Sequence, residues 1–284
     1  MQSDCVGLQG SFAKGQNTVI IAIFCHCKDT LLLFDGLCLA KLQSFFQSAK
    51  GKGLTLVFIE CKILKMNNII VSPSILAADY TNFGNAVSEI EASGAPWVHL
   101  DVMDGSFVPN LTFGPQLVRA LRLKSKAFFD VHLMVVNPEH FLMEFAYAGA
   151  DAITFHYEAA VHCHKFLTEL HELRVLAGIA ITPSTPCTVL EEVLPFIDIA
   201  LIMTVNPGFG GQELIPECLK KVEKLAKIRE AAGYKFRISV DGGINEKTAV
   251  NAIEAGADTL VMGSAFFGST DKKGLVERLQ ISGK

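Results

Sequence analysis

An α/β fold of the (β/α)₈ barrel class is predicted by two features of this 284-residue chain. Short runs rich in β-branched and aromatic residues recur eight times from residue 66 onward, and longer amphipathic stretches separate them. Eight strands joined by helices in about 220 residues fit such a barrel, which ordinarily takes roughly 200–250 residues. A doubly wound open sheet is the alternative. It usually has fewer strands and calls for a dinucleotide-binding glycine pattern after the first strand, which residues 69–78 lack.

The eight expected strands begin close to residue 66 and end near residue 262. They are Ile69–Ile75, Trp97–Val102, Ala127–Leu133, Ala152–His156, Leu176–Ile181, Ile199–Thr204, Phe236–Val240 and Thr259–Met262. Helix-like segments between them include Phe83–Ala92, Pro138–Ala148, His162–Arg174, Leu214–Ala232 and Lys247–Glu254. Local signals agree, because Asn137-Pro138 suits a helix start and Ala-Gly-Ala suits a helix end at 148–150 and again at 255–257.

Composition limits the classes of function. Hydrophobic residues make up 50% of the chain and charged residues 19%, so a sizeable core can be buried. The formal net charge of −4 leaves no basic surface for nucleic acid, and we expect no nucleic-acid partner. The longest apolar runs of residues 1–65, Val19–Cys25 and Leu54–Ile59, are too short for a bilayer span of roughly 20 residues. We therefore expect no membrane attachment, and the scattered cysteines favour a cytoplasmic protein with reduced thiols.

Residues 1–65 differ from the remainder of the chain. They contain seven lysines, no arginine and four acidic residues, whereas residues 66–284 are net acidic. Their lack of arginine argues against a mitochondrial transit peptide, and a signal peptide on Val19–Cys25 is a weaker alternative because no clear cleavage site follows. We predict that residues 1–65 are an atypical extension, disordered or not part of the functional protein. Residues 66–284, starting at Met66, form the predicted functional domain.

Polar residues collect where the expected strands end, which is the side where barrel enzymes carry their chemistry. Alternate side chains of a strand share a face, so His99, Asp101 and Met103 should project together into the barrel mouth. His132 ends the next strand and Asp241 ends the seventh. Two imidazoles and two carboxylates suit Zn²⁺, Fe²⁺, Mn²⁺ or Co²⁺. We predict one divalent metal ion per subunit, bound by His99, Asp101, His132 and Asp241.

Glycine-rich turns follow the last three expected strands: 206–212, Gly242-Gly243 and Gly263-Ser264. Glycine lets the backbone approach a ligand and turn its N–H groups toward an anion. The loops after strands seven and eight commonly bind phosphate in barrel enzymes. A phosphate-binding site is therefore predicted. It needs no lysine or arginine if backbone N–H groups supply the positive electrostatic potential that attracts the phosphate.

Five segments resemble the signature segments of the ribulose-phosphate 3-epimerase family. They are Ser72–Leu76, His99–Asn110, Asp130–Met134, Met203–Gln212 and Val240–Ile244. They follow the family's order across 66–284, while the family does not usually carry an extension such as residues 1–65. The resemblance implies a TIM barrel of the ribulose-phosphate-binding type.

The resemblance also implies an activity and a mechanism. The family is an isomerase of the pentose phosphate pathway that interconverts D-ribulose 5-phosphate and D-xylulose 5-phosphate at C3. Asp101 and Asp241 match its acid–base pair, and the metal would stabilise the enediolate. Met103, Met134 and Met203 match methionines that flank the reacting carbons, although core filling is their plainer interpretation.

The expected substrate contacts come from the glycine turns and from the resemblance. They are Ser74, His132, Gly208, Phe209, Gly210, Gly211, Asp241, Gly242, Gly243, Gly263 and Ser264. A simple turn hydroxyl is the alternative for Ser74. His156 and Glu158 follow the fourth strand and are expected to border the mouth behind the metal ligands.

Two other functions remain as alternatives to the pentose phosphate epimerase. A similar enzyme could epimerise a six-carbon ketose phosphate such as allulose 6-phosphate, although 208–211 and 241–243 look more like the pentose enzyme. A phosphate-binding barrel without turnover would be expected to lack an acid or a metal ligand, and all four are present. The expected partner is thus a small ketose phosphate, and a homo-oligomer is expected because barrels with apolar outer faces often associate.

Overall fold

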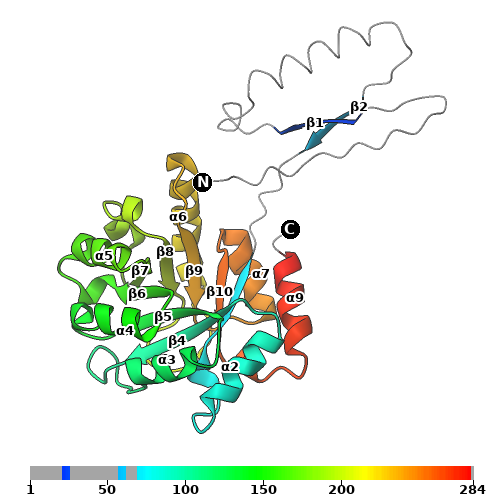
Figure 1. Ribbon diagram of the computed structural model, residues 1–284. Coiled ribbons are helices and arrows are strands. Elements are labelled where there is room, and N and C mark those ends of the chain that lie inside the picture. The colour runs from blue at the N-terminus through cyan, green and yellow to red at the C-terminus, as the bar shows by residue number, and fades with distance from the viewer. Residues whose placement is uncertain (1–20, 26–56, 62–68, 283–284) are drawn as a thin grey trace, which may run out of the picture. The chain divides into compact units, whose positions relative to one another are not determined.

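Strands and helices alternate along the chain in the computed structural model (Figure 1), which describes residues 21–25, 57–61 and 69–282. From residue 69 onward, eight parallel strands form one sheet in the order β3-β10-β9-β8-β7-β6-β5-β4. Their bounds are β3 (Ile70–Pro73), β4 (Trp97–Met103), β5 (Phe128–Met134), β6 (Ala152–His156), β7 (Leu176–Ile181), β8 (Ile199–Met203), β9 (Arg237–Asp241) and β10 (Thr259–Met262).

The sheet closes into a ring. Ser74, directly after β3, forms a parallel bridge with His99 of β4, so the two ends of the strand order meet. This closure confirms the predicted (β/α)₈ barrel and rules out the open sheet.

Helices follow most of the strands and cover the outside of the ring (Figure 1). They are α2 (Phe83–Ala92), α3 (Pro115–Arg122), α4 (Leu142–Ala148), α5 (Cys163–Glu172), α6 (Leu219–Ala232), α7 (Glu246–Ala255), α8 (Ser264–Phe267) and α9 (Lys272–Ser282). After β7 the chain forms two 3₁₀ turns instead of an α-helix, Cys187–Leu190 and Leu194–Phe196. The other 3₁₀ turns in the described region are Ile75–Ala77, Pro138–His140, Tyr157–Ala159 and Pro216–Cys218.

Helix boundaries follow local signals in the sequence. Asn245 begins α7 with a capping box, in which its side chain accepts from the Thr248 N–H and the Thr248 hydroxyl accepts from the Asn245 N–H. The predicted helix 214–232 instead begins at Leu219, because Pro216 disfavours helical angles at Ile215, which is extended. The predicted helix 138–148 divides at Phe141 into a 3₁₀ turn and α4.

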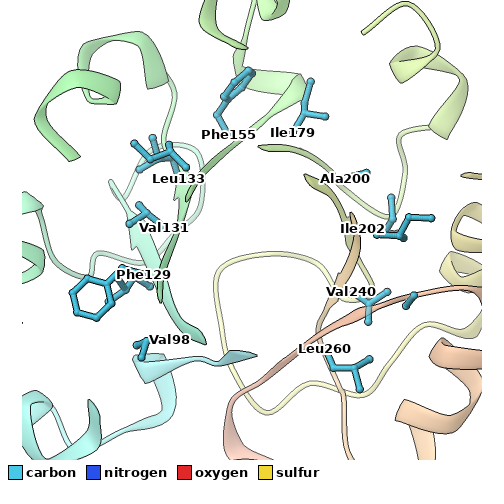
Figure 2. Close-up of a cluster of buried hydrophobic side chains, with 14 of the residues drawn as sticks. Val98, Phe129, Val131, Leu133, Phe155, Ile179, Ala200, Ile202, Val240 and Leu260 are labelled. Atoms are coloured by element: carbon cyan, nitrogen blue, oxygen red, sulfur yellow. The ribbon is translucent and has the colours of Figure 1, made fainter. Parts of the chain in front are cut away.

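The main hydrophobic core lies between the ring of strands and the helices. Figure 2 shows Phe129, Leu133, Phe155 and Ile179 around the outer side of the ring, and all four are fully buried. Burying each such side chain stabilises the fold by about 1.5–3 kcal/mol. A separate cluster of Ile70, Trp97, Ala152 and Ile199, from the first residues of four strands, fills the amino-terminal end of the barrel. The functional site therefore has room only at the carboxyl ends of the strands.

Residues 1–65 include two described strands, β1 (Ile21–Cys25) and β2 (Val57–Cys61), which pair in parallel. The remainder of this predicted extension lies outside the described residues, and its dispensability stays a prediction. The chain divides into two compact units at Met66, close to the predicted boundary. Within the part of the chain that the structure describes, no helix has the length and apolar character needed to cross a bilayer.

Candidate active site and metal centre

The four side chains predicted to bind a metal meet at the carboxyl end of the barrel. His99 and Asp101 lie on β4, His132 lies opposite Asp101 on β5, and Asp241 ends β9. Each offers one ligand atom, and these four atoms lie within 4.8 Å of one another. Atoms that share a zinc ion lie at most about 4.4 Å apart. The four atoms surround one point, and they would have to move closer to one another to share an ion.

The imidazole of His99 is held by a hydrogen bond to a carboxylate, as the imidazoles of metal-binding histidines commonly are. Its Nδ1 donates to Oδ2 of Asp130 at 2.7 Å, so Nε2 is the nitrogen that remains to take either a proton or a metal ion. That nitrogen is buried without a hydrogen-bond partner and lies 3.3 Å from Oδ1 of Asp101. Because this nitrogen faces a carboxylate in a buried site, either a proton or a metal ion has to lie between the two atoms. The donor set therefore fits a divalent metal ion.

The two aspartates predicted to be catalytic have opposite pKa shifts. Burial raises the pKa of Asp241 to about 7 although 17% of its side chain is exposed, and the negative charge of Asp101 adds to the rise. Burial also favours a higher pKa for Asp101, but the neighbouring imidazoles of His99 and His132 outweigh it and hold that pKa far below 3.8. One carboxyl is thus ionised while the other can carry a proton, which is what an acid–base pair requires.

The buried imidazoles also differ in pKa. Burial would lower the pKa of His99, but the carboxylates of Asp101 and Asp130 outweigh it and raise that pKa well above 6.5. For His132 burial dominates and lowers the pKa. A metal ion that binds this centre must therefore displace a proton from His99.

A cavity of about 670 Å³ opens beside the metal centre, a size typical of small-molecule sites. Predicted site residues on its wall are Ser74, Asp101, Met103, Met134, Met203, Gly208, Phe209, Gly210, Gly211, Asp241, Gly242, Gly243, Gly263 and Ser264. His99 and His132 are absent from the wall because both are fully buried. The wall residues that the structure describes include no lysine or arginine, so positive field for an anion would come from backbone amides.

Glycine is required by geometry in the turn after β9. Gly242 and Gly243 have φ values of 120° and 66°, which side chains rarely adopt. A Cβ on Gly243 would lie 2.2 Å from the backbone nitrogen of Leu214, and one on Gly242 would lie 2.4 Å from Cγ2 of Val205. The turn is therefore packed closely against the 205–214 segment, and both segments border the cavity.

The three cavity methionines are nearly fully buried. Met103 and Met134 pack against Val108, and Met203 packs against Val205 in a separate cluster. They both fill the core and border the cavity, so the two interpretations of these residues are compatible.

Two contacts behind the metal ligands were not predicted, although His156 itself was expected to lie there. Asp130 holds His99, and Nε2 of His156 lies 2.9 Å from Nε2 of His132. The alternation in Asp130-Val131-His132 could have indicated the first, because it places Asp130 inside the barrel beside His99 of the neighbouring strand. The second joins residues 24 positions apart and has no sequence signal.

Comparison with known proteins agrees with this geometry. The model of the "Ribulose-phosphate 3 epimerase family" matches residues 70–267. The ribulose-phosphate 3-epimerase of Treponema pallidum is 52% identical over 200 residues, covering 70% of this chain and 92% of the relative. The Bacillus subtilis protein of the same name is 44% identical over 213 residues, covering 75% and 98%.

The fold is also similar to that of proteins with much lower sequence identity. A variant of the tryptophan synthase alpha-subunit from Pyrococcus furiosus matches with a TM-score of 0.55 at 15% identity, covering 76% of this chain and 96% of that one. At this identity the match shows the shared barrel and no shared chemistry. The family match and the close relatives, over the same barrel that carries the four clustered metal-ligand candidates, show that the chain belongs to the ribulose-phosphate 3-epimerase family.

Proposed function

We propose that this enzyme interconverts D-ribulose 5-phosphate and D-xylulose 5-phosphate by inverting C3. The observation that carries the proposal is the position of two aspartates, Asp101 and Asp241, on the wall of one cavity and within one cluster of candidate metal ligands. The shared name of the close relatives supports the same reaction.

Inversion beside a ketone needs a base on one face of the carbon and an acid on the other. Asp101 is the ionised member and removes the C3 proton, while Asp241 delivers a proton to the opposite face. The two exchange roles in the reverse direction. Oδ2 of Asp101 accepts from the Ser74 hydroxyl, and Oδ1 faces the imidazoles of the metal centre. This division supports separate tasks for the two oxygens of Asp101.

The proposed metal ligands are His99, Asp101, His132 and Asp241, and Zn²⁺, Fe²⁺, Mn²⁺ and Co²⁺ all suit this set. When bound, the ion would act as a Lewis acid that offsets negative charge developing on the substrate oxygens. Met103, Met134 and Met203 exclude water around the reacting carbons. Their burial on the cavity wall supports this role.

The phosphate end of the substrate binds to backbone N–H groups of the turns after β9 and β10. The close packing of Gly242 and Gly243 and the position of Gly263 and Ser264 on the same wall support this placement. In the same proposal, residues 208–211 of the turn after β8 contact the sugar phosphate, and their place on the cavity wall supports this.

The proposal is tested by kcat/KM on D-ribulose 5-phosphate and on allulose 6-phosphate with metal-loaded protein. We expect the pentose to be preferred. Preference for the hexose would replace the proposal by the six-carbon alternative. Binding of both without turnover would identify a non-catalytic phosphate-binding barrel.

The proposal includes a homo-oligomer in the cytoplasm. The free thiols of Cys163, Cys187 and Cys218 support a reducing compartment. Sedimentation of the purified chain measures the oligomeric state directly, and a mass equal to one chain would refute that part.

A further inference from the structure

Behind the proposed metal centre, the ring of His132 rests against a second imidazole. Its Nε2 lies 2.9 Å from Nε2 of His156, and both side chains are fully buried. Two ring nitrogens at this distance share one proton, with one nitrogen donating and the other accepting. The direction of that hydrogen bond decides which nitrogen of His132 is left bare.

Glu158 sets the direction of this hydrogen bond. Its Oε2 lies 3.3 Å from Nδ1 of His156, and because a carboxylate only accepts, that Nδ1 carries the hydrogen. A neutral imidazole has a single N–H, so Nε2 of His156 is bare and accepts the N–H of His132 Nε2. Nδ1 of His132 is then bare, 3.0 Å from Oδ1 of Asp101 and 3.8 Å from Oδ2 of Asp241.

The carboxylate of Glu158 is itself held in place. Its second oxygen, Oε1, accepts from the backbone N–H of Thr182 at 2.8 Å and from the hydroxyl of Thr185. Nζ of Lys221, on α6, donates to the carbonyls of Thr182, Pro183 and Thr185 at 2.8, 2.7 and 2.7 Å. The turn after β7 is therefore fixed from the neighbouring helix, and it orients Glu158 toward His156.

We propose that Glu158 acts through His156 to hold His132 in the tautomer whose Nδ1 is free to bind a metal ion. Without this arrangement Asp101, 3.0 Å from Nδ1, would favour a hydrogen on that nitrogen and so block it. Asp130 contacts His99 directly, whereas Glu158 acts on His132 through His156. Glu158 and His156 are positioning residues, and the inference rests on the metal centre of the proposed function.

The test uses the full chain with Zn²⁺ alone as the probe. Glu158→Gln keeps the size of the side chain, but its amide can donate to Nδ1 of His156 and so permits the opposite tautomer. His171→Gln is the matched control, since it breaks a partly exposed histidine–carboxylate pair with Asp198 outside the site. Zinc dissociation constants are measured by competition with a chromophoric chelator, and histidine tautomers by ¹⁵N NMR of the zinc-loaded protein.

We expect Glu158→Gln to weaken zinc binding about 10–100-fold and His171→Gln to leave it unchanged. In the wild type, His156 should carry its hydrogen on Nδ1. A hydrogen on Nε2 of His156 would overturn the proposal even if Glu158→Gln failed to fold, and so would an unchanged zinc affinity in a folded Glu158→Gln chain.

The outcomes also separate this inference from the proposed reaction. An enzyme that turns over the pentose phosphate, with zinc affinity unaffected by Glu158→Gln, would refute the positioning role alone. A chain without turnover whose zinc affinity falls on Glu158→Gln would support the positioning role and refute the proposed reaction.

Discussion

The hydroxyl of Ser74 lies 2.5 Å from Oδ2 of Asp101, while the other oxygen of this carboxylate faces His99 and His132. Ser74 follows β3 and Asp101 lies on β4, so the contact crosses the seam where the ring of strands closes. A hydrogen bond from a hydroxyl to a carboxylate is short and strong, and it fixes the rotation of the acceptor. Asp101 is therefore held with its two oxygens in two different environments.

Asp241→Asn should lower kcat by about 10²–10⁴, because an amide cannot deliver the proton that the reaction requires. The backbone turn that follows the residue is unchanged, so affinity for inorganic phosphate should stay close to that of the wild type. A coupled epimerase assay on protein of verified metal content measures the first effect. Turnover near the wild-type level would contradict the role of Asp241.

Removal of divalent ions with a chelator should abolish turnover, and Zn²⁺, Fe²⁺, Mn²⁺ or Co²⁺ added back in turn should restore it. Metal affinity should also fall as the pH falls, because the raised pKa of His99 keeps a proton on the ligand that the ion must displace. Titration with Zn²⁺ at several pH values measures this dependence. Full turnover in metal-free protein would refute the metal requirement.

The contribution of Asp241 to the stability of the metal-free protein should fall as the pH rises from about 4 to about 7. The pKa of Asp241 is raised from 3.8 to about 7 on folding, so the folded chain holds a proton in this window that the unfolded chain has released. Ionisation beside Asp101 then costs folding free energy. Across this window thermal melts should show Asp241→Asn gaining stability relative to the wild type, and a constant difference between the two proteins would contradict the role of Asp241.

Gly243→Ala should raise KM and destabilise the fold, since its Cβ would lie 2.2 Å from the nitrogen of Leu214 at a φ of 66°. Gly84→Ala on α2 is the control, because no atom lies within 4 Å of its added Cβ. The control should keep the wild-type KM and should not lose stability. Equal KM values in the two variants would contradict the phosphate-binding role of the turn.

A chain of residues 66–284 should fold and keep full kcat. The compact unit from Asn67 to Lys284 contains all eight strands of the barrel and every proposed site residue. Circular dichroism and the coupled assay measure the two properties. Loss of either would show that residues 1–65 contribute to the functional protein.

Much of the fold is predictable because its strands are buried runs between clear turn signals. The bounds of β6, β7, β10 and α2 match the predicted ranges to the residue. The segment after β7 was harder, because Pro195 lacks the N–H that a continuous α-helix would use there, and two 3₁₀ turns form instead.

The position of the site is predictable for a different reason. The alternation of side chains along a strand places His99 and Asp101 on one face, and ring closure brings Asp241 to them from a distant part of the chain. The support for His132 was not predictable in detail, because the direction of a hydrogen bond between two imidazoles depends on Glu158 and on the turn after β7. The catalytic roles of these residues stay predictions.

The pairing of β3 with β10 also has a consequence for biosynthesis. These two strands are the first and last of the barrel, so the ribosome must release nearly the whole chain before they can pair. Asp241 lies on β9, the strand next to β10. A shortened chain that stops before β9 would lack both the ligand Asp241 and a closed ring of strands. The ability to bind the metal ion would therefore arise only at the end of synthesis.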